Sequence, residues 1–207
     1  MEYLTVDAFK AMLNQALEEI VAHEDEFSQL DAVIGDGDHG NAIVTAFSAV
    51  VKSTYAAAEF KSMLNDMGFS VMLETSGSTS TLLGAFFLGM SDCASGTQLD
   101  AAGVKSMFAG GLAGVQKQTP AKVGDKTMMD ALIPAVNAIQ ECKSDDIKEL
   151  MLAAADAAIQ GARATVQMKA NYGRARNYGE RSIGYADSGA SSWSTMFHAF
   201  AQSVLNN

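Results

Sequence analysis

The 207-residue chain is poor in residues that interrupt helices or cross-link chains, with two prolines, two cysteines and one tryptophan. Scarce proline and 48% hydrophobic residues favour helices, because proline removes a helical hydrogen bond. Cys93 and Cys142 are far apart and form no CxxC pair, which is typical of a reducing cytoplasm and predicts buried thiols. The length predicts one domain over residues 1–207 with a sizeable core.

Basic residues are also scarce. The chain has 14 lysines and arginines against 24 acidic residues, a formal net charge of −10. This balance argues against a nucleic-acid partner, because non-specific binding needs cationic side chains facing phosphates. No apolar run approaches the roughly 18 residues of a membrane span, and the acidic start at Met1–Leu4 lacks a secretory signal pattern. We therefore expect a cytoplasmic protein without a nucleic-acid or membrane partner.

Apolar periodicity predicts an all-α fold of eight helices. Apolar residues spaced i, i+3, i+4 form stripes along the chain, and no alternating pattern of convincing length predicts a strand. Pro134 should kink or interrupt the helix that contains it. The expected helices cover residues 9–21, 41–57, 61–74, 82–93, 100–118, 127–142, 145–169 and 190–205.

The segment Asp31–Asn41 is the strongest functional signal, with three carboxylates, one imidazole and three glycines. Carboxylate oxygens suit Mg²⁺, and Asp36 and Asp38 would point the same way on an extended backbone. Three crowded carboxylates repel one another unless a cation lies among them. An EF-hand is excluded, because Asn41 and Phe47 stand where its glycine and glutamate belong. The alternative, a solvated acidic turn, is disfavoured by the apolar residues within the segment.

Two polar breaks between helices have weaker signals. The run Ser76–Thr81, of glycine and hydroxyl residues, leads into a helix and suits either a phosphate or an ordinary cap and loop, which alone is the more favoured interpretation. Gly124–Thr127 resembles a phosphate loop, but the Walker pattern G-x-x-x-x-G-K-[ST] is absent. This second break predicts a helix start with Asp125 or Thr127 as the cap.

All four arginines fall between Arg163 and Arg181, and three of them lie in Gly173–Gly184, here called the arginine segment. A basic, glycine-rich segment in an acidic protein suits a polyphosphate, because guanidinium groups match phosphate oxygens. The alternative is a surface loop that balances local acid. Together with the acidic and hydroxyl segments, the arginine segment predicts a metal–nucleotide site at helix ends.

The strings LDAVIGDGDHGN, GDKTM and GRARNYGERSIGYADSGASS resemble the nucleotide-binding L subunit of dihydroxyacetone kinase. The resemblance spans essentially the whole chain, and the combination of strings is specific. It implies a barrel of eight antiparallel helices with ADP or ATP bound at one end. It also implies that Asp31, Asp36 and Asp38 bind two Mg²⁺ ions.

The same resemblance implies the nucleotide contacts and a charge-offsetting role for two arginines. Arg174 and, as a second-tier candidate, Arg181 would offset charge during phosphoryl transfer, and no other catalytic residue is assigned. Several positions depart from the family pattern: the run Ser76–Leu82 lacks one glycine and the proline of the family's GGASGPL, Thr119 stands where a glycine is common, Arg176-Asn177 replaces Ser-Tyr, and Ser188 replaces a proline. The implied nucleotide-binding residues are His39, Gly40, Asn41, Ala42, Ser78, Thr79, Thr119, Met128, Arg174, Asp187, Ser188 and Gly189.

The resemblance further implies partners, because nothing in this chain resembles the substrate-binding half of the enzyme. A separate K subunit would hold dihydroxyacetone, and in phosphotransferase-linked systems a multiphosphoryl carrier subunit would rephosphorylate the bound ADP. Two alternatives remain: a nucleotide-binding regulatory module, and a kinase subunit acting on another small hydroxylated substrate. A purely structural metal-binding bundle leaves the arginine segment unexplained.

Overall fold

The computed structural model describes residues 1–54 and 57–206 and is almost entirely helical. Its α-helices are α1 (Val6–Ala22), α2 (Glu24–Ile34), α3 (His39–Ser53), α4 (Phe60–Glu74), α5 (Ser78–Ser91), α6 (Ala101–Gln116), α7 (Met129–Glu141), α8 (Ile147–Ala164) and α9 (Ser188–Asn206). The 3₁₀ segments are η1 (Thr165–Gln167) and η2 (Arg174–Ser182). The strands β1 (Leu4–Thr5) and β2 (Gln98–Leu99) pair antiparallel.

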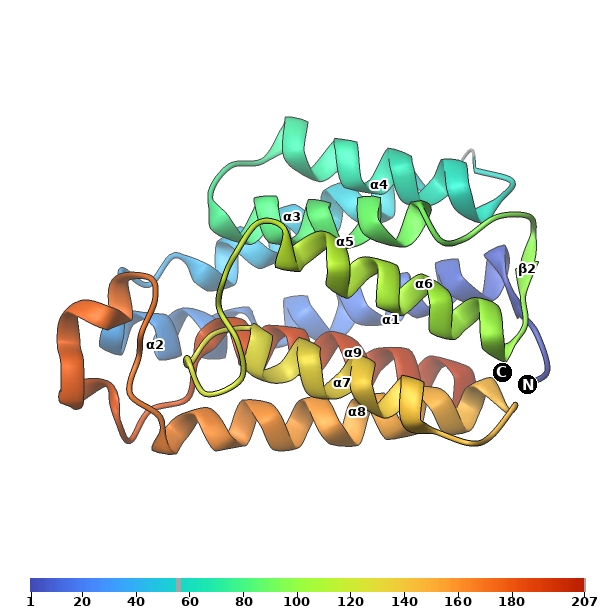
Figure 1. Cartoon of the computed structure of the whole chain (residues 1–207). Coiled ribbons are helices and arrows are strands. Elements are labelled where there is room, and N and C mark those ends of the chain that lie inside the picture. Colours follow the sequence, from blue (N-terminus) through green and yellow to red (C-terminus); the bar gives the residue numbers. More distant parts are fainter. Residues whose placement is uncertain (55–56, 207) are drawn as a thin grey trace.

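Eight of the helices form a closed ring. From α3 to α9 each helix contacts the next one along the chain, and α1 completes the ring by packing on both α3 and α9. The helices run back and forth along one direction, so that the chain ends lie at the right of Figure 1 and the long polar loops at the left. The predicted all-α class is therefore confirmed. Within the described residues, no helix is long and apolar enough to cross a membrane.

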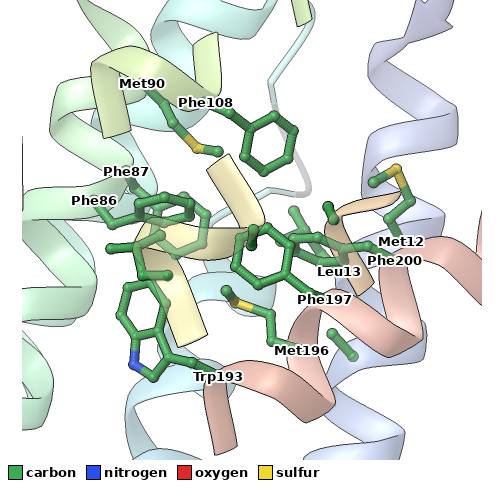
Figure 2. Packing of buried hydrophobic residues seen from close by; sticks show 14 of the residues in the cluster. Met12, Leu13, Phe86, Phe87, Met90, Phe108, Trp193, Met196, Phe197 and Phe200 are labelled. Carbon is green, nitrogen blue, oxygen red and sulfur yellow. The ribbon is translucent and has the colours of Figure 1, made fainter. Parts of the chain in front are cut away.

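One hydrophobic cluster fills the ring, and aromatic rings connect its sides (Figure 2). The Phe86 ring of α5 lies 5.1 Å from Trp193 and 6.3 Å from Phe108, measured between centroids. Phe197 of α9 contacts Phe108 at 5.9 Å and Phe200 at 6.1 Å. These contacts tie α5, α6 and α9 together, so the loops at the ends of these helices have a rigid support.

Helix α2 is a ninth α-helix among the described residues, and the expected count of eight missed it. Only Phe27 and Ile34 are buried on it, so its apolar stripe is too weak for periodicity to show. The acidic residues in its first turn stabilise the helix, because negative charge is favourable near a helix N-terminus. Asp31 therefore lies on a helix rather than in a loop. From the sequence we expected the backbone from Asp36 to Asp38 to be extended. It is instead bent, because Gly37 has φ +79° and Asp38 has helical dihedral angles.

Pro134 does not interrupt α7, which is continuous from Met129 to Glu141. Proline at this position cannot donate to the carbonyl oxygen of Asp130. Gly161 of α8 packs against that oxygen so closely that an added Cβ would lie 1.8 Å from it. The neighbouring helix thus covers the carbonyl that the proline leaves without its helical partner.

Three further expectations were wrong in detail. The helix expected to reach residue 169 ends at Ala164, where η1 begins. Cys93 is exposed and Cys142 half-buried, so the free thiols are not buried as predicted. The helix expected over residues 41–57 ends at Ser53, and residues 55–56 lie outside the described part of the chain.

Candidate functional site

The polar loops meet around one cavity at the end of the ring opposite the chain termini. The cavity has a volume of about 620 Å³ and is lined by the α2–α3, α4–α5 and α6–α7 loops and by the segments around η2 and the start of α9. Most of the predicted site residues line it, namely Asp31, Asp36, Asp38, His39, Ala42, Ser78, Thr79, Thr119, Met128, Arg174, Asp187, Ser188 and Gly189. The fold therefore brings together segments from almost the whole length of the chain.

The three aspartates form a compact cluster, because one carboxylate oxygen from each lies within 4.8 Å of the others. Asp31, in the last turn of α2, accepts hydrogen bonds from the backbone N–H groups of Gly37 (2.8 Å) and Asp38 (3.1 Å). These bonds hold the turn that presents Asp36 and Asp38. The cluster offers the oxygen ligands that Mg²⁺ prefers, so the residues present fit a magnesium site.

Arg174 lies beside the acidic cluster. Its guanidinium group forms an ion pair with Asp36 and lies 3.7 Å from Asp38. Gly173, with φ +61°, precedes it and starts η2 in the left-handed region that favours glycine. The side chain of Arg174 is 63% exposed, so it can also reach a ligand in the cavity. The acidic and arginine segments thus meet, as the sequence predicted for a site that holds both a cation and phosphates.

His39 connects three elements at the cavity wall. Its ring nitrogens lie 2.9 Å from the Ser192 hydroxyl on α9 and 3.5 Å from the Thr79 hydroxyl on α5. Burial lowers the pKa of His39 below its ordinary value, although the carboxylates of Asp31 and Asp38 act in the opposite direction. The imidazole is therefore neutral near pH 7 and serves as a hydrogen-bonding link.

The hydroxyl run forms the start of α5. Gly77, with φ +96°, precedes the helix and provides no side-chain cap. Ser78 and Thr79 lie in the first helical turn and line the cavity. The N-terminus of a helix carries partial positive charge and free N–H groups, which suit an anion. The run therefore supplies no side-chain N-cap, and phosphate binding at the start of α5 stays a prediction.

The part of the cavity wall formed by the α6–α7 loop includes Thr119 and the buried Met128. Asp125 does not cap α7, contrary to one of the two alternatives. Its carboxylate accepts hydrogen bonds from the backbone N–H of Lys122 (2.9 Å) and the side chain of Asn171 (2.8 Å), and these bonds lower the pKa of Asp125. Thr127 is not the cap either, because the N-cap position of α7 is Met128 and has no side-chain cap; the Thr127 hydroxyl does accept a hydrogen bond from the N–H of Met129, just before the helix. This wall is therefore tied to the residues just before the arginine segment.

The turn before α9 completes the cavity. Asp187 accepts a hydrogen bond from the N–H of Ala190 (2.7 Å), which caps the helix. Burial raises the pKa of Asp187 to about 7. The Ser188 hydroxyl donates to the carboxylate of Asp31 at 3.4 Å. The serine that replaces the family's proline thus adds a polar contact to the acidic cluster.

Three predicted residues do not line the cavity. Gly40 is buried where α3 packs on α2, and an added Cβ would lie 2.1 Å from the carbonyl oxygen of Glu24. Asn41 is exposed, and the Arg181 guanidinium lies 5.7 Å from the centre of the Tyr178 ring. Gly40 therefore has a packing role in this structure.

The cavity also includes residues that the sequence analysis did not assign, among them Lys126, Tyr172 and Trp193. Tyr172 directly precedes the arginine segment, so its position was a usable signal. Lys126 belongs to the Gly124–Thr127 break. Trp193 was part of an apolar helix stripe, and nothing in the sequence distinguishes it from an ordinary core residue.

Comparison with known proteins identifies the family. Residues 33–202 match the DAK2 domain model. The chain is 35% identical to the ADP-binding subunit DhaL of the PEP-dependent dihydroxyacetone kinase 1 of Listeria innocua, over 94% of each chain. It is 32% identical to a D-erythrulose kinase of Mycolicibacterium smegmatis, over 91% of this chain and 33% of that protein.

Among solved structures, the dihydroxyacetone kinase from C. freundii in complex with AMP-PNP and Mg²⁺ has a similar fold, with a TM-score of 0.72 and 22% identity. The match covers 94% of this chain and 33% of that one, and at this identity it shows the fold alone. The domain match and the Listeria innocua relative show more: the chain belongs to the DAK2 domain family.

Proposed function

We propose that the chain is the nucleotide- and magnesium-binding subunit of a dihydroxyacetone kinase, a phosphotransferase that transfers a phosphoryl group to dihydroxyacetone held by a separate K subunit. The observation that carries this proposal is the meeting of three aspartates, an arginine and the N-terminus of α5 on one cavity. The Listeria innocua relative is named as an ADP-binding subunit, which agrees with this arrangement.

In this proposal Asp31, Asp36 and Asp38 hold two Mg²⁺ ions, which when bound neutralise charge on the nucleotide phosphates. The start of α5, with Ser78 and Thr79, donates hydrogen bonds to phosphate oxygens. Arg174 offsets the negative charge that shifts during phosphoryl transfer. Phosphoryl transfer depends mainly on positioning and charge neutralisation, and these residues provide both.

Thr119 and Met128, which line the cavity in the α6–α7 loop, are the residues that we assign to the adenine of ADP or ATP. Asp187, Ser188 and Gly189 close the site beside the acidic cluster. We retain Ala42 as a contact that lines the cavity, and Arg181 only as a second-tier candidate because it lies against Tyr178. The single hydrophobic cluster supports one domain over residues 1–207.

A subunit of this kind is incomplete alone. The Listeria innocua relative is named as a subunit of a PEP-dependent kinase, which supports a K subunit and a multiphosphoryl carrier subunit as partners. The two free cysteines are consistent with the cytoplasmic location expected from the sequence.

The experiment that tests the proposal has two stages. Native mass spectrometry of the purified chain, followed by calorimetry with Mg-ADP, should show one nucleotide and two magnesium ions bound. A coupled assay for dihydroxyacetone phosphate should then show turnover when a cognate K subunit and carrier subunit are added. Failure to bind Mg-ADP would refute the proposal at its first stage.

A second acceptor is favoured by one observation, the similarity to a D-erythrulose kinase. The acceptor is chosen by the substrate-binding partner, so the same nucleotide site suits dihydroxyacetone or a four-carbon ketose. Parallel assays with both ketoses and the same partner distinguish these substrates. A chain that binds Mg-ADP but transfers to neither would instead support the regulatory module.

A further inference from the structure

Lys126 is buried in the loop between α6 and α7, with 1% of its surface exposed. Its ammonium group donates hydrogen bonds to the carbonyl oxygens of Thr165 (2.7 Å) and Tyr185 (2.5 Å). Burial lowers the pKa of Lys126, although the carboxylates of Asp187 and Asp130 act in the opposite direction. A buried ammonium ion is unfavourable unless such partners replace its water. The side chain therefore has a specific set of contacts within the protein.

The backbone of Lys126 is also unusual. Its φ is +59°, and no other residue except glycine has a positive φ in the described residues 1–54 and 57–206. Glycine adopts this conformation without steric strain, whereas a lysine does not. The loop thus has a lysine where the backbone alone favours glycine. Residues with strained backbone are common at functional sites. A lysine at this strained position therefore suggests that its ammonium group has a function.

The contacts of Lys126 join two walls of the cavity. Lys126 belongs to the loop that carries Met128, and Tyr185 precedes Asp187 in the turn before α9. Thr165, at the end of α8, connects the two, because its carbonyl accepts from Lys126 and its hydroxyl accepts from the N–H of Asp187 at 2.9 Å. One ammonium group therefore fastens both segments to the same helix end.

The same contacts show what Lys126 does not do. The Gly124–Thr127 break resembles a phosphate loop in sequence, and in such a loop the lysine would reach phosphate oxygens. Here two of the three ammonium donors are directed to backbone carbonyls. Lys126 acts on the shape of the cavity.

We propose that Lys126 is a positioning residue of the nucleotide cavity, which holds the turn of Asp187, Ser188 and Gly189 in register with the Met128 wall. This inference rests on the proposed function, since it assumes that the cavity takes a nucleotide. A cavity held in its binding geometry before the ligand arrives binds more tightly, because less order has to be created on binding.

The test compares the wild type with Lys126→Met, Lys126→Gly and Lys126→Arg, and uses Lys122→Met as a control. Lys122 lies in the same loop and is exposed. Three quantities are measured: Mg-ADP affinity by calorimetry, the melting temperature, and amide hydrogen exchange of the nucleotide-free protein. Lys126→Gly matters most, because it removes the ammonium group while relieving the left-handed backbone.

We expect Lys126→Met and Lys126→Gly to bind Mg-ADP at least about tenfold more weakly. The amides of Asp187 and Ala190 should exchange faster, while core amides of α5 and α9 remain protected and Lys126→Gly still melts cooperatively. Lys126→Arg should recover part of the affinity, because it keeps the charge and donors. Lys122→Met should match the wild type in all three measurements.

Wild-type affinity and unchanged exchange in Lys126→Gly would overturn the inference. So would faster exchange throughout the core together with an affinity loss that only follows the unfolded fraction, because Lys126 would then be merely structural. A wild type that binds no Mg-ADP would refute the proposed function, and the exchange data on the nucleotide-free variants would still decide whether Lys126 holds the turn.

Discussion

Arg174 forms an ion pair with Asp36, which joins the arginine segment to the acidic segment at the wall of the cavity. The same guanidinium lies 3.7 Å from Asp38. A cation bound by these aspartates would hold phosphates within reach of Arg174. The contact therefore brings the acidic segment and the arginine segment, the two strongest polar signals of the sequence, together in one site.

Asp36→Asn and Asp38→Asn should each abolish Mg-ADP binding without unfolding the protein. Each variant loses a carboxylate of the cluster but only an exposed contact with Arg174. Exposed ion pairs contribute about 0–1 kcal/mol, and relief of repulsion offsets part of that loss. Calorimetry and melting of the nucleotide-free protein measure both effects. Unchanged Mg-ADP affinity in both variants would disprove the metal assignment.

Arg174→Ala should weaken Mg-ADP binding by about one to two decades, because a charge-assisted hydrogen bond contributes roughly 1.5–3 kcal/mol. Arg163→Ala is the matched control. Arg163 is exposed at the end of α8 and lines a separate hollow of about 350 Å³. Titration of both variants under one set of conditions compares them directly. Equal, small losses would mean that the arginine segment only balances surface charge.

Gly40→Ala should destabilise the protein by about 1–3 kcal/mol, the usual range for overpacking. The new Cβ would lie 2.1 Å from the backbone oxygen of Glu24, so α2 and α3 would have to separate. Because these helices carry Asp31 and lead from Asp38, nucleotide affinity should fall as well. Gly103→Ala is the control, since its Cβ would meet side-chain atoms rather than backbone, those of Leu99 at 3.2 Å and Asp100 at 3.3 Å. Equal melting temperatures for the two variants would contradict this packing role.

Asp125 should make the stability of the protein pH-dependent. Its hydrogen bonds with Lys122 and Asn171 lower its pKa in the folded state. The stability it contributes is therefore complete above the unfolded-state pKa, about 4, and is lost as the pH falls through the folded-state pKa. Asp125→Asn should be less stable than the wild type near neutral pH, and the difference should shrink in acid. Urea unfolding across this range tests the prediction, which a pH-independent difference would exclude.

The isolated chain should show no turnover with a phosphoryl donor and dihydroxyacetone. His23 lies at the junction of α1 and α2, and His198 is exposed on α9, so neither faces the cavity. Activity should appear with the cognate substrate-binding subunit and should then require Asp31, Asp36 and Asp38. A coupled assay of the mass-verified chain, with and without its partner, provides the answer. Turnover by the chain alone would rule out the two-subunit mechanism.

The sequence by itself determined the all-α class and most of the helices, and it predicted the chemistry of the site. Asp31, Asp36 and Asp38 predicted a cation site, and the arginine segment predicted an anion, because clustered charges of one sign favour a ligand of the opposite sign. Apolar periodicity found the helices of the ring, since burial in a core imposes one apolar face on each of them. Periodicity did not reveal helix α2, because only two of its residues are buried.

The tertiary structure decided which segments meet. Periodicity shows which face of a helix is buried but not against what, so it could not predict that Gly40 receives the Glu24 carbonyl or that Trp193 borders the cavity. Nor could it predict that the Lys126 ammonium would bind the backbone at Thr165 instead of a phosphate. The Lys126 contact joins residues 39 positions apart in the chain, and only the packing of the helices brings them within hydrogen-bonding distance.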